Sequence, residues 1–153
     1  MMLYRLTRKA YIDDISGRGA ETHGGRWNNK GLPALYTASS RALAVLEVAV
    51  HVPLGIIPID YFMCGIELPD GISIFEIKPS DLPKKWNSNP IIQATQMLGD
   101  DFLKGRKHLA MKIPSASVSG DFNYILNPAH PDFNQIKVAF TEPFEFDSRL
   151  FKM

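Results

Sequence analysis

The sequence is most informative at residues 35–51, LYTASSRALAVLEVAVH, where a short strand pattern is followed by an apolar helix pattern. Every residue from 42 to 50 is Ala, Leu or Val except Glu47. Charged side chains are rarely buried unless they are paired or functional, because removing a carboxylate from water is costly. Among the helical neighbours of Glu47, only His51 carries a group that can answer its charge. Glu47 is therefore either half of a structural ion pair, with His51 or an arginine, or the functional group of a site.

Strand patterns dominate the chain on both sides of this stretch. The expected strands cover residues 2–8, 33–37, 57–68, 72–77, 109–113 and 136–146. The expected helices cover residues 41–51 and 91–103, and the expected irregular segments cover residues 9–30 and 121–132. The first helix begins after Ser39 or Ser40, either of which can act as its N-cap, and ends before Pro53. Many strands with about two long helices, not alternating regularly, predict a single α+β domain over residues 1–153.

The composition is that of an ordinary globular protein and argues against several functional classes. The 153 residues are 45% hydrophobic and 22% charged, with a formal net charge of +1. Basic residues form no block, which gives no support to nucleic-acid binding. Cys64 is the single cysteine, so neither an intramolecular disulfide nor a cysteine-based metal cluster is expected.

The four histidines also lack the spacing of metal ligands, and no metal site is expected. The N-terminus has no apolar core typical of a signal peptide, and no apolar run approaches the roughly 18 residues of a membrane span. We therefore expect a cytoplasmic protein that does not associate with membranes.

The segment at residues 23–31, HGGRWNNKG, has the composition of an anion-binding loop. Gly24 and Gly25 allow the backbone to approach a ligand closely. Arg26 offers a planar fork that suits phosphate or carboxylate. The alternative is a Gly-rich turn in which Arg26 pairs with an acid and Trp27 covers the core.

Three further candidates lie near expected strand ends. Tyr36 ends a strand just before the helix of Glu47, a position where sites are often assembled, although a half-buried strand aromatic is the alternative. Ser115 follows Pro114, and Asn123 adds a side chain that can both donate and accept hydrogen bonds. The alternative for these two is a loop in which they cap backbone groups. No GxSxG pattern surrounds any serine, so a hydrolase triad is not indicated.

Together these segments resemble the RES domain, the toxin half of the RES–Xre toxin–antitoxin systems. The matching segments are Tyr4-Arg5, GGRWNNKG at residues 24–31, LYTASSRALAVLE at 35–47, PSASV at 114–118 and NYILNPAHPDF at 123–133. Several motifs in one order and at fitting separations are far more specific than any one of them alone. The family is named after an Arg, a Glu and a Ser. These correspond here to Arg26, Glu47 and Ser115, with Ser117 and Ser119 as the alternatives for the serine. Tyr36 matches a further tyrosine of the family.

The resemblance implies a fold like that of the ADP-ribosyltransferases, in which a split mixed sheet clasps NAD. It also implies cleavage of NAD at the nicotinamide–ribose bond, with NAD as substrate and no further cofactor. Some relatives pass the ADP-ribose to a protein instead of water.

The resemblance also implies a role for each candidate residue. Glu47 would oppose the positive charge that develops at the ribose, or bond a ribose hydroxyl. Arg26 would bind the pyrophosphate, and Tyr36 would stack on a flat ring. Ser115 would position Glu47 or the ribose, and Asn123 would contribute to NAD binding.

An apolar helix disfavours an ionised carboxylate, so a nearby arginine, Arg26 or Arg5, is expected to offset the desolvation of Glu47. The implied partner is an Xre-type helix-turn-helix antitoxin that blocks the site sterically, at the rim formed by the loops around Arg26 and after Pro114. The alternatives are an ADP-ribosyltransferase that modifies a cellular protein and a catalytically silent binding domain. A ribonuclease toxin is disfavoured because such enzymes usually need a basic surface.

Overall fold

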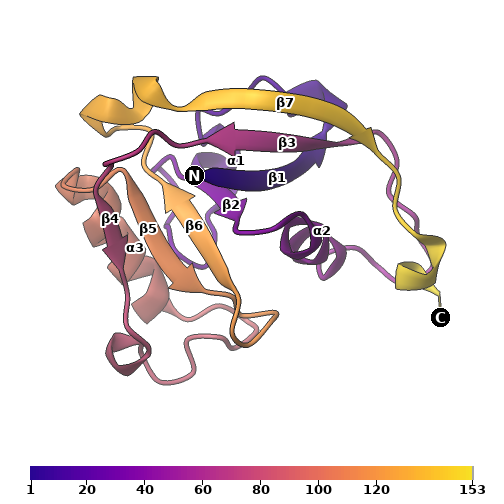
Figure 1. Ribbon diagram of the computed structural model, residues 1–153. Coiled ribbons are helices and arrows are strands. Elements are labelled where there is room, and N and C mark those ends of the chain that lie inside the picture. Colours follow the sequence, from indigo (N-terminus) through magenta and orange to yellow (C-terminus); the bar gives the residue numbers. More distant parts are fainter. Residues whose placement is uncertain (153) are drawn as a thin grey trace.

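The computed structural model describes residues 1–152 and has a seven-stranded sheet in the order β4-β5-β6-β2-β1-β3-β7 (Figure 1). The strands are β1 (Met2–Arg8), β2 (Leu35–Ala38), β3 (Tyr61–Glu67), β4 (Ile74–Glu76), β5 (Ala110–Pro114), β6 (Phe122–Leu126) and β7 (Lys137–Phe144). The helices are α1 (Arg18–His23), α2 (Arg41–Ala49) and α3 (Gln93–Gly105), with short 3-10 helices at Lys9–Tyr11, Pro79–Asp81, Pro131–Gln135 and Ser148–Phe151. No helix within residues 1–152 is both long and apolar enough to cross a membrane.

The sheet is mixed and divides between β2 and β1. Strands β4 and β5 pair in parallel, whereas the other neighbouring strands pair antiparallel. Within the described residues, β1 and β2 share the single register pair Tyr4 with Ala38, although β1 and β3 pair along the whole of β1. Figure 1 shows β1, β3 and β7 as one group and β4, β5 and β6 as another that runs in a different direction. The predicted α+β class with a split mixed sheet is confirmed.

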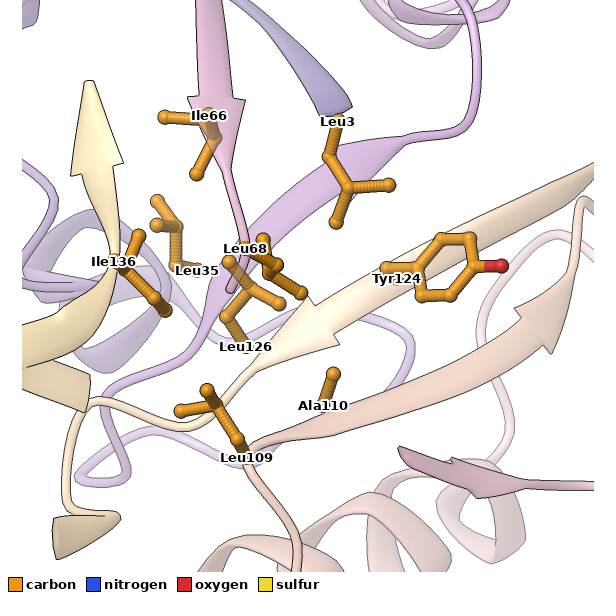
Figure 2. Close-up of a cluster of buried hydrophobic side chains, with 9 residues drawn as sticks. All are labelled: Leu3, Leu35, Ile66, Leu68, Leu109, Ala110, Tyr124, Leu126 and Ile136. Atoms are coloured by element: carbon orange, nitrogen blue, oxygen red, sulfur yellow. The ribbon is translucent and has the colours of Figure 1, made fainter. Parts of the chain in front are cut away.

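Three clusters of buried apolar side chains hold these parts together. One lies across both groups of strands and includes Leu3 from β1, Ile66 from β3 and Leu126 from β6 (Figure 2). A second joins α3 to β5 and β6 and includes Trp27 from the Gly-rich segment. A third joins α2 to β1 and β3 through Leu43. Because α2 and α3 belong to different clusters, each side of the split has its own packed support.

Helix α2 turns its carboxylate toward the sheet. Ser40 confirms the predicted N-cap, since its side chain accepts a hydrogen bond from Leu43 N at 3.1 Å, and the helix ends at Ala49, earlier than expected. Leu43 and Ala44 are the buried residues of the helix and pack on the strands. Residues three and four positions apart share a helix face. Glu47 follows both of these residues at that spacing, so it lies on the side of α2 that faces the sheet.

Strand β6 is not expected from the sequence and lies in the middle of the sheet, between β5 and β2. Two prolines favour an irregular segment over residues 121–132, yet its first half is a strand whose last three residues are buried. Pro128 and Pro131 both follow the strand, so they end it and do not interrupt it.

The structure differs from the expected elements in three smaller ways, at a loop, at the start of a strand and in the edge strand. Helix α1 lies within residues 9–30, where a loop is expected, and residues 57–60 precede β3 instead of belonging to it. Pro143 lies inside β7 without ending it. Strand β7 is at the edge of the sheet, where a residue without an N–H group is tolerated.

Candidate functional site

A cleft of about 780 Å³ opens beside the junction of β1 and β2. Volumes of roughly 300–1,000 Å³ are typical of sites that bind small molecules. Four of the predicted site residues line it: Arg26, Tyr36, Glu47 and Asn123. The fifth, Ser115, is 4% exposed and lies between the lining residues Pro114 and Ala116. The structure therefore brings together all five residues that the sequence singles out.

Glu47 is held at one of its two carboxylate oxygens. Oε1 accepts hydrogen bonds from Ser115 Oγ at 2.9 Å and from Asn123 Nδ2 at 2.7 Å. The Ser115 oxygen itself accepts from the backbone N–H groups of Ser117 and Val118, both at 3.1 Å. A serine hydroxyl has one proton, so these backbone donors leave that proton for Glu47. Oε2 has no hydrogen-bond partner among residues 1–152 and is not one of their buried unpaired atoms, which leaves it open to the cleft.

The hydrogen bonding of Asn123 is arranged around this carboxylate. Its Oδ1 is the one buried side-chain nitrogen or oxygen within residues 1–152 that has no hydrogen-bond partner. A carboxylate accepts hydrogen bonds and donates none, so the amide must turn Nδ2 toward Glu47. Leaving a buried acceptor unpaired costs about 1–3 kcal/mol. Asn123 therefore donates to Glu47 while its own Oδ1 stays without a hydrogen-bond partner.

Arg26 lines the same cleft as Glu47, but the two form no ion pair within 4.0 Å. Its Nη1 donates to the carbonyl oxygens of Trp86 at 2.8 Å and Ser88 at 2.9 Å. Burial lowers the pKa of Arg26, and the nearby charge of Glu47 opposes that shift. The alternative prediction, a structural pair between Arg26 and an acid, is not present within residues 1–152. The other guanidinium nitrogens have no partner there and are available to an anion.

Buried side chains fix the Gly-rich segment around Arg26. Tyr36 Oη accepts a hydrogen bond from Trp27 N at 3.0 Å and donates one to Asn28 Oδ1 at 2.7 Å. Asn28 is fully buried, and its Nδ2 donates to three backbone carbonyls at 2.8, 3.1 and 3.1 Å. Burial is the main cause that raises the pKa of Tyr36. Tyr36 thus lines the cleft and also holds the segment through its hydroxyl, a role that the sequence analysis does not predict.

Helix α3 packs closely against the same segment. A Cβ on Gly99 would lie 1.7 Å from the carbonyl oxygen of Trp27, so this approach requires glycine. The next residue, Asp100, accepts hydrogen bonds from Asn29 N at 2.9 Å and from Asn29 Nδ2 at 2.7 Å. Trp27 is 2% exposed, which places it in the core as the structural alternative predicted. Successive residues of α3 therefore set the position of the segment that carries Arg26.

The loop before α3, for which the sequence predicts no role, also borders the cleft. Asn87, Asn89 and Ile91 line the cleft. Trp86 packs on Trp27 with ring centroids 6.3 Å apart, and its carbonyl accepts from Arg26. This polar, proline-rich loop has no periodic pattern. The one sequence signal for its place at the cleft is Trp86, an aromatic residue among polar ones.

Three other titratable residues line the cleft: Tyr4, Arg5 and His51. Arg5 Nη1 donates to the carbonyl oxygens of Asp14 at 2.8 Å and Tyr11 at 3.3 Å, and burial lowers its pKa. His51 is exposed. It forms no ion pair with Glu47, so the predicted structural alternative for this carboxylate is not present in the described chain.

Comparison with known proteins identifies the family. Residues 2–147 match the RES domain. The chain belongs to the RES domain family. This confirms the resemblance inferred from the ordered motifs.

Several curated proteins are similar to this RES domain over nearly their whole length. The protein named Toxin Res from Yersinia enterocolitica serotype O:8 / biotype 1B is 39% identical over 153 residues, which cover 98% of this chain and 99% of the relative. Toxin Res from Photorhabdus laumondii subsp. laumondii is 40% identical over 155 residues, covering 99% and 98%. The Prs ADP-ribosylating toxin of Sphingobium sp. (strain YBL2) is 36% identical over 142 residues, covering 92% and 88%.

The fold of the RES domain is also similar to a chain in the crystal structure of the M. tuberculosis MbcT–MbcA toxin–antitoxin complex. The TM-score is 0.74 at 20% sequence identity, and the likeness covers 98% of this chain and 86% of that chain. At this identity the likeness concerns the fold, and it agrees with the predicted architecture.

Proposed function

We propose that this RES domain is a toxin that degrades NAD by breaking the bond between nicotinamide and ribose. The observation that carries the proposal is the Glu47 carboxylate, held at Oε1 by Ser115 and Asn123 and open at Oε2 in a cleft that also contains Arg26. The relatives named Toxin Res, which match almost the entire chain, support this assignment.

The reaction breaks the C–N bond between ribose C1′ and the nicotinamide ring nitrogen, and the bonding electrons pass to the nicotinamide. Positive charge develops on the ribose as this bond lengthens. Oε2 of Glu47 opposes the charge, and a carboxylate that is already fixed does so without reorganisation. Water then adds to C1′ and releases a proton, which yields ADP-ribose. NAD is the substrate in this scheme, and no further cofactor takes part.

The other site residues bind and position. Arg26 binds the pyrophosphate through the guanidinium nitrogens that the carbonyls of the neighbouring loop leave unused. Ser115 is buried and does not line the cleft, which favours the role of positioning Glu47 over contact with the ribose. Asn123 lines the cleft and bonds Glu47, so it serves both substrate and carboxylate. Tyr36 offers its ring to a flat part of NAD.

The direct test is incubation of the purified protein with NAD, followed by chromatographic separation of the products. We expect nicotinamide and free ADP-ribose in equal amounts and in the absence of any protein acceptor. A folded protein that leaves NAD intact would rule out the proposal.

A second candidate is transfer of ADP-ribose to a cellular protein. The specific observation in its favour is the 36% identity with a relative named as an ADP-ribosylating toxin. The two reactions share the bond-breaking step and differ in the acceptor. Labelled NAD added to a cell extract distinguishes them, because transfer places the label on a protein whereas hydrolysis leaves it on free ADP-ribose.

A toxin that degrades NAD in the cytoplasm would exhaust the supply of its own cell, so an inhibitor must accompany it. The toxin–antitoxin complex of a protein with this fold supports an antitoxin as the partner, and the resemblance to the RES–Xre systems makes an Xre-type helix-turn-helix protein the expected one. Expression of the chain alone should stop bacterial growth and lower NAD levels. Co-expression with the protein encoded beside it should restore both.

A further inference from the structure

A second, smaller cavity opens off the cleft beside β1. Its volume is about 170 Å³, well below that of the cleft. Sites that enclose a whole small molecule usually measure roughly 300–1,000 Å³. Arg5 and Tyr36, with Gly19 and Ala20 of α1, line both the cavity and the cleft, whereas Arg18 lines the cavity alone. This cavity, the Arg5–Arg18 pocket, is therefore a side compartment for one group of a ligand that lies in the cleft.

The charged side chains of the Arg5–Arg18 pocket favour an anion. Arg5 is half-buried and donates from Nη1 to the carbonyl oxygens of Tyr11 and Asp14, so its Nε and Nη2 have no hydrogen-bond partner among residues 1–152. The side chain of Arg18 is exposed and forms no ion pair within the same residues. Asp14 is the one acid among the described residues that line the pocket, and its Oδ1 accepts from Ser16 N at 2.9 Å and from Ser16 Oγ. Two guanidinium groups and one carboxylate leave a net positive charge.

The walls of the pocket are fixed before a ligand arrives. Gly17 is buried with φ 75°, and a Cβ at this position would lie 2.6 Å from the Ala34 nitrogen, so the close packing requires glycine. The carbonyl oxygen of Gly17 accepts from Glu21 N at 3.1 Å and from Ala34 N at 3.4 Å. The bonds from Arg5 to Tyr11 and Asp14 tie the preceding residues to β1. A pocket that is already ordered lowers the entropic cost of binding.

The position of the pocket indicates which group it takes. In the proposed function Arg26 binds the pyrophosphate, so a second cationic compartment suits a dinucleotide that carries a further phosphate. In dinucleotide-binding proteins an arginine commonly accommodates the 2′-phosphate that distinguishes NADP from NAD. The planar guanidinium fork matches the oxygens of such a phosphate.

We infer that the Arg5–Arg18 pocket binds the 2′-phosphate of NADP, so that this RES domain cleaves NADP as well as NAD. The same C–N bond breaks, and its electrons pass to the nicotinamide. Water adds to ribose C1′ and releases a proton, which yields ADP-ribose 2′-phosphate. This inference rests on the proposed function and widens its substrate class.

The test compares the use of NADP and NAD by the wild type and by two variants, Arg18→Gln and Arg18→Glu, whose fold is checked by circular dichroism. The two variants change the charge at one position from positive to neutral and to negative, and Arg18 does not line the cleft. The matched control is Lys104→Gln, which changes the net charge as Arg18→Gln does, because Lys104 is exposed outside both the pocket and the cleft.

We expect the wild type to cleave NADP with a kcat/KM at least equal to that for NAD. Arg18→Gln should lower kcat/KM for NADP by about 10-fold, the effect of losing one charge-assisted hydrogen bond, and Arg18→Glu should lower it further. Both variants should cleave NAD as the wild type does, and Lys104→Gln should leave the ratio of the two substrates unchanged. A wild type that cleaves NAD and leaves NADP intact would overturn the inference. Equal losses on NAD and NADP in Arg18→Gln would also overturn it, because the pocket would then bind a group that both substrates share.

Binding without turnover separates this inference from the proposed function. Calorimetry compares adenosine 2′,5′-bisphosphate with adenosine 5′-monophosphate, and we expect the bisphosphate to bind the wild type about 10-fold more tightly and Arg18→Glu with no such preference. The same preference in a chain that cleaves neither dinucleotide would leave the pocket standing and refute the function. Inorganic phosphate is titrated alone as a third ligand. Binding of this ion that depends on Arg18, without any preference for the bisphosphate, would assign the pocket to free phosphate and overturn the inference.

Discussion

Ser115 Oγ donates a hydrogen bond to Glu47 Oε1 at 2.9 Å, although 68 residues separate the two in the chain. Glu47 belongs to α2, which packs on β1 and β3, whereas Ser115 follows β5 on the other side of the split sheet. The bond therefore joins the two groups of strands at the cleft. It fixes the carboxylate relative to both walls.

Glu47→Gln should leave the fold intact and slow NAD cleavage by about 100- to 1,000-fold, the usual effect of removing one electrostatic stabiliser. The amide keeps the size of the side chain and loses the charge that opposes the developing ribose cation. Circular dichroism checks the fold, and nicotinamide release gives the rate. Near-wild-type turnover in a folded variant would make Glu47 a structural residue.

Ser115→Ala should reduce both stability and turnover, with Ser117→Ala as the matched control. The alanine removes one donor from Glu47 and leaves the N–H groups of Ser117 and Val118 without their acceptor, which should cost about 1–3 kcal/mol in the free energy of unfolding. Ser117→Ala keeps its backbone N–H and should behave as the wild type does. Urea denaturation and kcat measure the two effects. Equal losses in both variants would contradict the assignment of Ser115 among the neighbouring serines.

Arg26→Lys should weaken the use of NAD although it keeps the charge. Lysine lacks the planar fork and cannot bond the carbonyls of Trp86 and Ser88 while it also holds a phosphate. Loss of one charge-assisted hydrogen bond of about 1.5–3 kcal/mol corresponds to a roughly 10- to 100-fold fall in kcat/KM. Arg41→Lys, outside the cleft, is the control and should leave kcat/KM unchanged. A wild-type kcat/KM in the Arg26→Lys variant would refute the role of Arg26 in binding the pyrophosphate.

Gly99→Ala should destabilise the protein and raise KM for NAD, because the new methyl group would lie 1.7 Å from the Trp27 carbonyl oxygen. Overpacking of this kind typically costs about 1–3 kcal/mol. Gly105→Ala is the control at the end of the same helix, where an added Cβ meets nothing within 4 Å. It should instead stabilise the helix by about 0.5–1 kcal/mol. Thermal unfolding and KM are measured on both variants. A Gly99→Ala protein as stable as the wild type and with the same KM would show that position 99 does not require glycine.

Local sequence patterns predict those parts of the fold whose residues carry their own signal. The strand pattern of residues 2–8 and the serine cap of α2 are local features, and both are found as expected. The cleft residues Arg26, Tyr36, Glu47 and Asn123 are found through motifs that keep their order along the chain. That the four residues meet in one cleft depends on the tertiary structure, which the motifs do not specify by themselves.

The features that sequence reasoning misses depend on distant partners. Strand β6 carries strand-forming residues of its own, Phe122, Tyr124 and Ile125, but the prolines that follow obscure this signal, and its place in the sheet depends on pairing with β2 and β5. The need for glycine at position 99 follows from a carbonyl group that belongs to Trp27, far away in the chain. Asn87 and Asn89 reach the cleft because Arg26 and Trp27 hold their loop in place. No local pattern records such contacts.

The order of synthesis delays assembly of the cleft until late in the chain. Asn123 leaves the ribosome 76 residues after Glu47, an interval of about 4–15 s at roughly 5–20 residues per second. Strand β6 must then insert between β2 and β5 before Asn123 and Ser115 reach the carboxylate. A nascent chain therefore carries an unassembled cleft until β6 has been made and has taken its place in the sheet.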